Sequence, residues 1–273
     1  PGGIEKTMAV VFFSIGLVTL VIGILKLLNR IPSTALALIL LILSLLALRM
    51  VMTSLNFPAS LVTSDVFNPK MFASGPLNSS IGDLIVNEVL ILIGCVFLFR
   101  NYHRLRSIRW VYRYPLVGWI FSFVCSLLVL FSALYPFVII QTVYNNSAIS
   151  LDISQTLQFD ALRILAMLSV LLSGVCSFMV SHVFIRLLIS SGKTAVVLIA
   201  FAVAAVIFAI FNYDNRQYFL SSLVVGSMYF LVVFFTRLYA SLSRLGFSTF
   251  AYLFVSIFFL SLNGAWAIHT FEL

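Results

Sequence analysis

Residues 33–55 read STALALILLILSLLALRMVMTSL, and Arg49 is the one charged residue among them. A helix needs about 20 predominantly apolar residues to cross the hydrocarbon core of a bilayer. This segment therefore predicts a membrane-spanning helix. Seven more segments have the same character, and the eight predicted spans are residues 8–28, 33–55, 81–99, 116–143, 158–188, 195–211, 219–239 and 248–268.

The composition of the chain indicates the same class of protein. Of its 273 residues, 62% are hydrophobic and 9% are charged, whereas soluble domains are about half apolar and about a quarter charged. The surplus of apolar side chains has to face lipid. We therefore expect an all-α fold, a polytopic transmembrane helix bundle in which residues 1–273 form a single domain in the lipid bilayer.

The charged residues are divided unequally between the loops. Residues 100–115 contain five arginines and no acid, which is typical of a cytoplasmic loop. With this loop inside and eight spans, both termini are predicted to be extracytoplasmic. All the acidic residues then fall on the outer side: Glu5, Asp65, Asp83, Glu88, Asp152, Asp160, Asp214 and Glu272. The net charge of +8 is explained by basic residues retained in the cytoplasm, so we predict no nucleic-acid partner.

Several ionisable residues lie inside the predicted spans, where they usually face the protein interior and are paired. Arg49, Glu88 and Arg163 are all roughly 7–12 Å below the outer boundary, at 1.5 Å rise per residue. Asp83 lies nearer the outer surface, and Asp160 precedes Arg163 by three residues. These five residues form a candidate intramembrane polar cluster. Three roles remain open for it: fixing helix packing, binding a ligand or ion from outside, or relaying protons or substrate.

No other group of residues indicates chemistry. Each of Cys95, Cys125 and Cys176 lies in an apolar run, without the close pairing of a metal site. The histidines are dispersed, and the chain has neither a Gly-rich phosphate loop nor a nucleophile elbow. We therefore predict no catalytic, cofactor-binding or metal-binding residue in this segment.

Two outer segments resemble a known family. Residues 67–74 read FNPKMFAS, residues 79–87 read SSIGDLIVN, and residues 149–153 read ISLDI. This order resembles the multi-spanning amino-terminal region of large bacterial sensor histidine kinases of two-component systems. In that family an aromatic-x-Pro segment is followed by Ala-Ser and then by a Ser-x-Gly-Asp-Leu helix start. The chain departs from the family at Ser79, where a proline is usual.

The resemblance implies that the chain is the membrane-anchoring and signal-sensing region of such a kinase, multi-pass in the bacterial inner (cytoplasmic) membrane. It implies a longer protein, in which residues beyond Leu273 supply an extracytoplasmic sensing domain, a further span and a cytoplasmic kinase core that uses ATP and Mg, forms a homodimer and phosphorylates a response regulator. The segment itself lacks a phosphoacceptor-His helix and ATP-binding boxes, so we expect it to be non-catalytic. Two alternatives remain: a small transporter or channel subunit that uses the polar cluster, and a membrane-embedded enzyme that uses His182 and the arginines.

Overall fold

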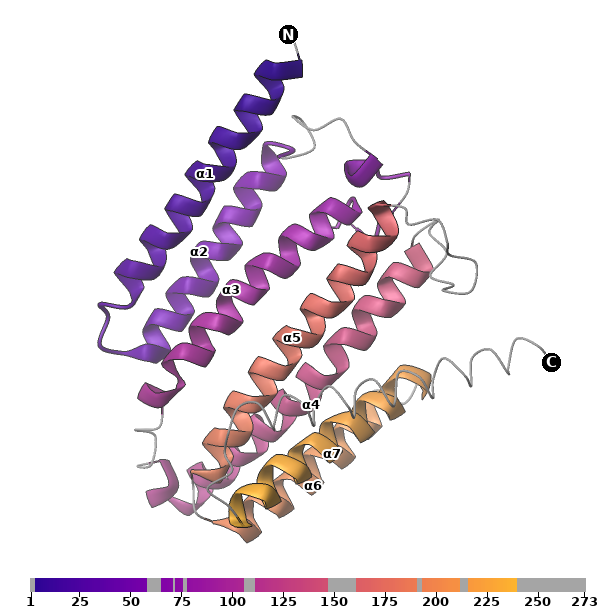
Figure 1. Ribbon diagram of the computed structural model, residues 1–273. Coiled ribbons are helices and arrows are strands. Elements are labelled where there is room, and N and C mark those ends of the chain that lie inside the picture. Colours follow the sequence, from indigo (N-terminus) through magenta and orange to yellow (C-terminus); the bar gives the residue numbers. More distant parts are fainter. Residues whose placement is uncertain are drawn as a thin grey trace, which may run out of the picture. The chain divides into compact units, whose positions relative to one another are not determined.

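The computed structural model describes residues 3–57, 65–70, 72–75, 78–105, 111–146, 161–190, 193–211 and 216–239. These residues form helices and contain no β-strand, so the predicted all-α class is confirmed for them (Figure 1). The elements are α1 (Gly3–Leu28), α2 (Thr34–Ser54), a 3₁₀ turn η1 (Asp65–Phe67), α3 (Ile81–Leu105), α4 (Pro115–Asn146), α5 (Ala161–Ile189), α6 (Thr194–Phe211) and α7 (Arg216–Tyr239).

Five helices in the described part of the chain are long and apolar enough to cross a membrane. They are Thr34–Ser54, Ile81–Tyr102, Pro115–Asn146, Leu162–Ile189 and Thr194–Phe211. Shorter apolar stretches cover Ser14–Leu28 of α1 and Phe219–Phe235 of α7. Large apolar side chains such as Leu116 and Phe211 are 74% and 82% exposed, which suits helices that face lipid. The predicted eighth span, residues 248–268, lies outside the described residues, and the eight-span topology stays a prediction.

The helices group into two compact units. The first comprises Pro1–Asn101 and Ile139–Ser173, and the second comprises Tyr102–Val138 and Gly174–Leu273. Helices α4 and α5 therefore each contribute one end to each unit. Pro136 lies inside α4, and the helix continues through it.

The first unit has an aliphatic core between α1, α2 and α3. Its buried residues are Leu28, Ala37, Leu41, Leu45, Leu90 and Phe97. Helix α2 begins after Pro32, where Ser33 is the N-cap residue and its Oγ accepts the Leu36 N–H at 3.4 Å. A serine cap satisfies a backbone donor that the first helical turn leaves without a partner. The short turn before it lets α1 and α2 run side by side (Figure 1).

The second unit has an aromatic core. The rings of Phe201 in α6 and Phe230 in α7 stack with centroids 3.9 Å apart and planes 5° apart. Helix α7 also approaches α4 closely, because a Cβ at Gly226 would be 3.1 Å from the Cβ of Ala133. Small residues at such contacts are typical of helix packing in membranes.

Candidate functional site

The candidate site is built around the first turn of α3. Ser80 is its N-cap residue: the Ser80 Oγ accepts the Asp83 N–H at 3.1 Å, and the Ser80 carbonyl accepts the Leu84 N–H at 3.0 Å. An acidic residue in the first turn is favoured because the helix dipole is positive at this end. The local sequence Ser-x-x-Asp thus places one carboxylate at the start of α3.

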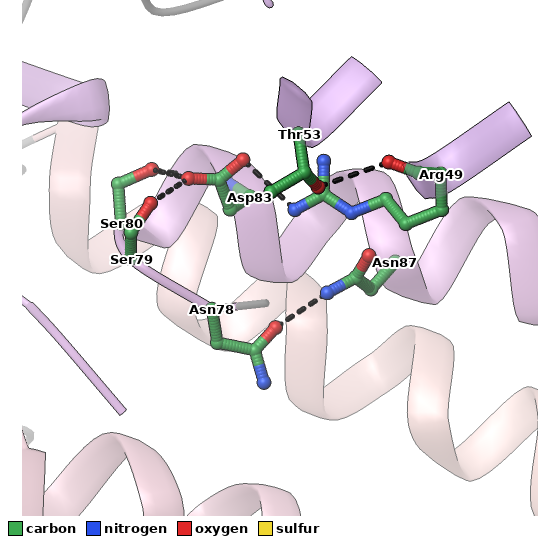
Figure 2. A network of polar contacts seen from close by, with 7 residues as sticks. All are labelled: Arg49, Thr53, Asn78, Ser79, Ser80, Asp83 and Asn87. Carbon is green, nitrogen blue, oxygen red and sulfur yellow. Dashed lines mark hydrogen bonds and ion pairs between the residues drawn. The ribbon is translucent and has the colours of Figure 1, made fainter. Parts of the chain in front are cut away.

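The Asp83 carboxylate accepts hydrogen bonds from three side chains. Its Oδ1 accepts from Arg49 Nη2 in α2 at 2.9 Å, and its Oδ2 accepts from the hydroxyls of Ser79 and Ser80 at 2.5 and 2.8 Å. Figure 2 shows the carboxylate between the guanidinium on one side and the two hydroxyls on the other. Arg49 and Asp83 are 6% and 7% exposed, so the ion pair that joins α2 to α3 is largely shielded from solvent.

Phe67, in the 3₁₀ turn η1, contacts the same turn of α3. A Cβ added at Gly82 would overlap the Phe67 ring. Glycine is therefore required at position 82 for the aromatic ring of η1 to lie against the helix. Residues 67–74 and 79–87, two of the three stretches that carry the family resemblance, are in direct contact through this pair.

Further hydrogen bonds hold the loop that precedes α3 in place. Asn87 Nδ2 donates to Asn78 Oδ1 at 2.5 Å, and the Asn78 N–H donates to the Gly75 carbonyl at 3.2 Å. Gly75 has φ of +132°, a backbone conformation that favours glycine. The Ala73 N–H donates to the Asn146 carbonyl at 3.3 Å, which ties the loop to the end of α4. A displacement of this loop would therefore act on α3 and α4 together.

Of the five residues of the predicted polar cluster, the structure places Arg49 and Asp83 in this network. The structure brings Arg49 and Asp83 together and buries Asp83, which the sequence placed nearer the surface. Glu88 lies further along α3 and is 1% exposed. Arg163 is in α5 of the same unit, and its buried Nη1 atom has no acceptor among the residues that the structure describes. Asp160, its predicted partner, lies outside them.

The sequence analysis did not single out the serines and asparagines of this network as site residues. Their signal was present, because Ser80 and Asp83 have the spacing of a helix-capping motif. Ser79 occupies the position where the family usually has a proline, and its hydroxyl donates to Asp83.

A second polar cluster lies in the second unit. His182 Nδ1 is 3.1 Å from the Tyr229 hydroxyl, and Arg186 Nε donates to His182 Nε2 at 3.3 Å. Because Nε2 accepts, the imidazole proton resides on Nδ1 and is donated to Tyr229. His182 and Tyr229 are 2% and 0% exposed. The sequence analysis missed Tyr229, since it is 47 residues away and no local pattern connects the two.

The Asp83 network is a set of hydrogen bonds and one ion pair between a loop and two helices. Within the described ranges, no three His, Cys, Asp or Glu residues are placed to hold a metal ion. Cys95, Cys125 and Cys176 are buried. The Asp83 carboxylate is occupied by its three donors, and together they connect a loop to two helices.

Comparison of the chain with protein-family models, with curated proteins and with solved structures gave no match.

Proposed function

We propose that this chain is the membrane-anchoring and signal-sensing region of a bacterial two-component sensor histidine kinase. The observation that carries the proposal is the Asp83 network, which connects the outer loop to α2 and α3 through buried hydrogen bonds. The contact between Phe67 and Gly82 supports the proposal, because it gives a physical reason why residues 67–74 and 79–87, two of the stretches on which the resemblance rests, occur together.

In the proposed mechanism, a stimulus that moves the outer loop withdraws the Ser79 and Ser80 hydroxyls from Asp83. The carboxylate then loses the two hydroxyls that fix its position, so its ion pair with Arg49 rearranges and α2 shifts against α3. Such a switch needs two packings for which the stimulus has different affinities. Reversing a 1:99 population requires a difference of about 5.5 kcal/mol. Removing one partner of a buried ion pair costs about 3–5 kcal/mol, so the Asp83 network supplies most of this difference and further contacts of the loop supply the rest.

The remaining parts of the proposal concern the longer protein. Beyond Leu273, an extracytoplasmic sensing domain and a further span lead to a cytoplasmic kinase core, which binds ATP and Mg, works as a homodimer and transfers phosphate to a response regulator. The topology is eight spans with both termini outside the cytoplasm, in the bacterial cytoplasmic membrane.

The test begins with the open reading frame beyond Leu273. The full-length protein is placed in lipid nanodiscs and supplied with labelled ATP and Mg, and phosphohistidine is measured. Asp83→Asn is compared with Ser54→Ala, a matched control on α2, whose exposed side chain bonds only its own helix at Met50. We expect Asp83→Asn to change the autophosphorylation rate by at least about fivefold, the lower range of coupling between sites, and the control to leave it unchanged.

The possible failures differ in meaning. A reading frame that ends at Leu273, or a full-length protein without phosphohistidine, would exclude the kinase assignment. An active kinase with equal rates in Asp83→Asn and wild type would exclude the Asp83 network as the sensing element. If the kinase assignment is excluded, the transporter alternative is tested by measuring solute flux into proteoliposomes that carry wild type or Glu88→Gln. Transport through the cluster predicts flux in wild type and a lower flux in Glu88→Gln.

A further inference from the structure

Helices α1 and α3 enclose two cavities within the first unit. One, of about 410 Å³, lies where α1 ends and α3 reaches Arg100 and Asn101. The other, of about 480 Å³, lies further along the same two helices and extends to Phe67. Ile93 lines both cavities, so they are adjacent at this residue. We call the two together the α1–α3 crevice.

The crevice is polar at one end and apolar along its length. Its polar lining residues at the Arg100 end are Asn29, Arg100 and Asn101. The other lining residues of both cavities are apolar, apart from Ser14 in the second cavity. From Arg100 to Val89 of α3, the crevice extends roughly 16 Å at 1.5 Å per residue. That distance is about half the thickness of the hydrocarbon core of a bilayer.

The polar end of the crevice is also the positive end of the first unit. Lys26 lies in the last turn of α1, and Arg30 follows the helix. The acidic side chains that the structure describes in this unit, Asp83 and Glu88, lie in the half of α3 remote from Arg100. Basic residues next to a membrane attract anionic lipids. The α1–α3 crevice, with basic residues at one end and apolar walls over this length, complements a molecule with a negative head and a hydrocarbon tail.

We propose that the α1–α3 crevice binds one anionic phospholipid. The phosphate lies at the guanidinium of Arg100, next to the side chains of Asn29 and Asn101. One acyl chain runs between α1 and α3 along Val96 and past Ile93 toward Val89. A lipid of zero net charge fits the apolar walls equally well but gains less from the basic end. This site is independent of the kinase assignment, because it requires only the two helices.

The test uses the complete chain, purified and exchanged into mixed micelles with equal amounts of phosphatidylglycerol and phosphatidylcholine of identical acyl chains. Bound lipid is counted by native mass spectrometry. Wild type is expected to retain one phosphatidylglycerol in preference to phosphatidylcholine. Arg100→Gln is expected to weaken that binding about fivefold, as loss of about 1 kcal/mol implies. Arg113→Gln removes the same charge from an exposed side chain of the second unit and is the matched control, with an expected change below about twofold.

A second variant probes the apolar walls without changing charge. Ile93→Trp fills the junction of the two cavities and is expected to reduce bound phosphatidylglycerol, while circular dichroism shows unchanged helix content. Glycerol 3-phosphate, which has the phosphate but no acyl chain, is expected not to compete. Equal losses in Arg100→Gln and Arg113→Gln, unchanged binding in Ile93→Trp with its helices intact, or displacement of the lipid by glycerol 3-phosphate would each overturn the proposal.

Discussion

The ion pair between Arg49 and Asp83 gives the sharpest prediction about stability. Asp83→Asn keeps the size of the side chain but removes its charge, and it leaves the guanidinium of Arg49 buried opposite a neutral amide. Loss of one partner of a buried ion pair costs about 3–5 kcal/mol. The favourable charge at the start of α3 is lost as well, at about 0.3–1 kcal/mol. We expect a total loss of about 4 kcal/mol, a large fraction of the roughly 5–15 kcal/mol that stabilises a typical folded protein.

The assay is denaturation of the purified chain in micelles by increasing SDS, followed by far-UV circular dichroism. Ser54→Ala is the control, since its hydroxyl is exposed and bonds only the carbonyl of Met50. The double variant Arg49→Met with Asp83→Leu replaces the pair by apolar side chains of similar size. Such replacements are often neutral or stabilising, so the double variant is expected to be more stable than Asp83→Asn by about 3 kcal/mol or more.

Two results would refute this reasoning. Asp83→Asn within about 0.5 kcal/mol of wild type, the range of ordinary surface substitutions, would mean that the pair is well solvated. A loss of stability in the double variant that equals the sum of the losses in Arg49→Met and Asp83→Leu would mean that Arg49 and Asp83 are not energetically coupled.

Two further substitutions are expected to destabilise the chain in the same assay. Gly82→Ala forces the new methyl group into the ring of Phe67 and is expected to cost about 1–3 kcal/mol. The control is Gly16→Ala, which has open space around its Cβ and is expected to be neutral or slightly stabilising. Equal effects of the two substitutions on stability would contradict the packing argument. Tyr229→Phe removes the partner of the His182 Nδ1–H and is expected to cost about 1–3 kcal/mol; a variant as stable as wild type would show that this hydrogen bond contributes nothing.

The all-α class was predictable because apolar runs of 20 residues leave few other ways to satisfy the backbone in lipid. The helix ends were less predictable. Helix α3 continues to Leu105, past the predicted end at residue 99. Hydropathy reports which residues face lipid, whereas a helix continues as long as its backbone hydrogen bonds do. Pro115 opens α4, as is common for the first helical position, where its missing N–H is not needed.

The membership of the Asp83 network was only partly predictable, because depth along a helix says nothing of rotation about its axis. Arg49 and Glu88 were matched by depth, yet the long side chain of Arg49 reaches Asp83 at the start of α3. Arginine commonly extends its charged group away from the depth of its own Cα. The pairing of His182 with Tyr229 depends on packing between α5 and α7, for which a single sequence carries no local signal.

The division of the chain into two units has a consequence for the order of folding. Neither unit is one continuous stretch of sequence, since Pro1–Asn101 belongs with Ile139–Ser173. Helices α1 to α3 therefore leave the ribosome well before the ends of α4 and α5 that complete their unit. At roughly 5–20 residues per second, the intervening segments take about 4–14 s to synthesise. Arg49 and Asp83 both belong to the part made first, so the ion pair between them requires no residue that is made later.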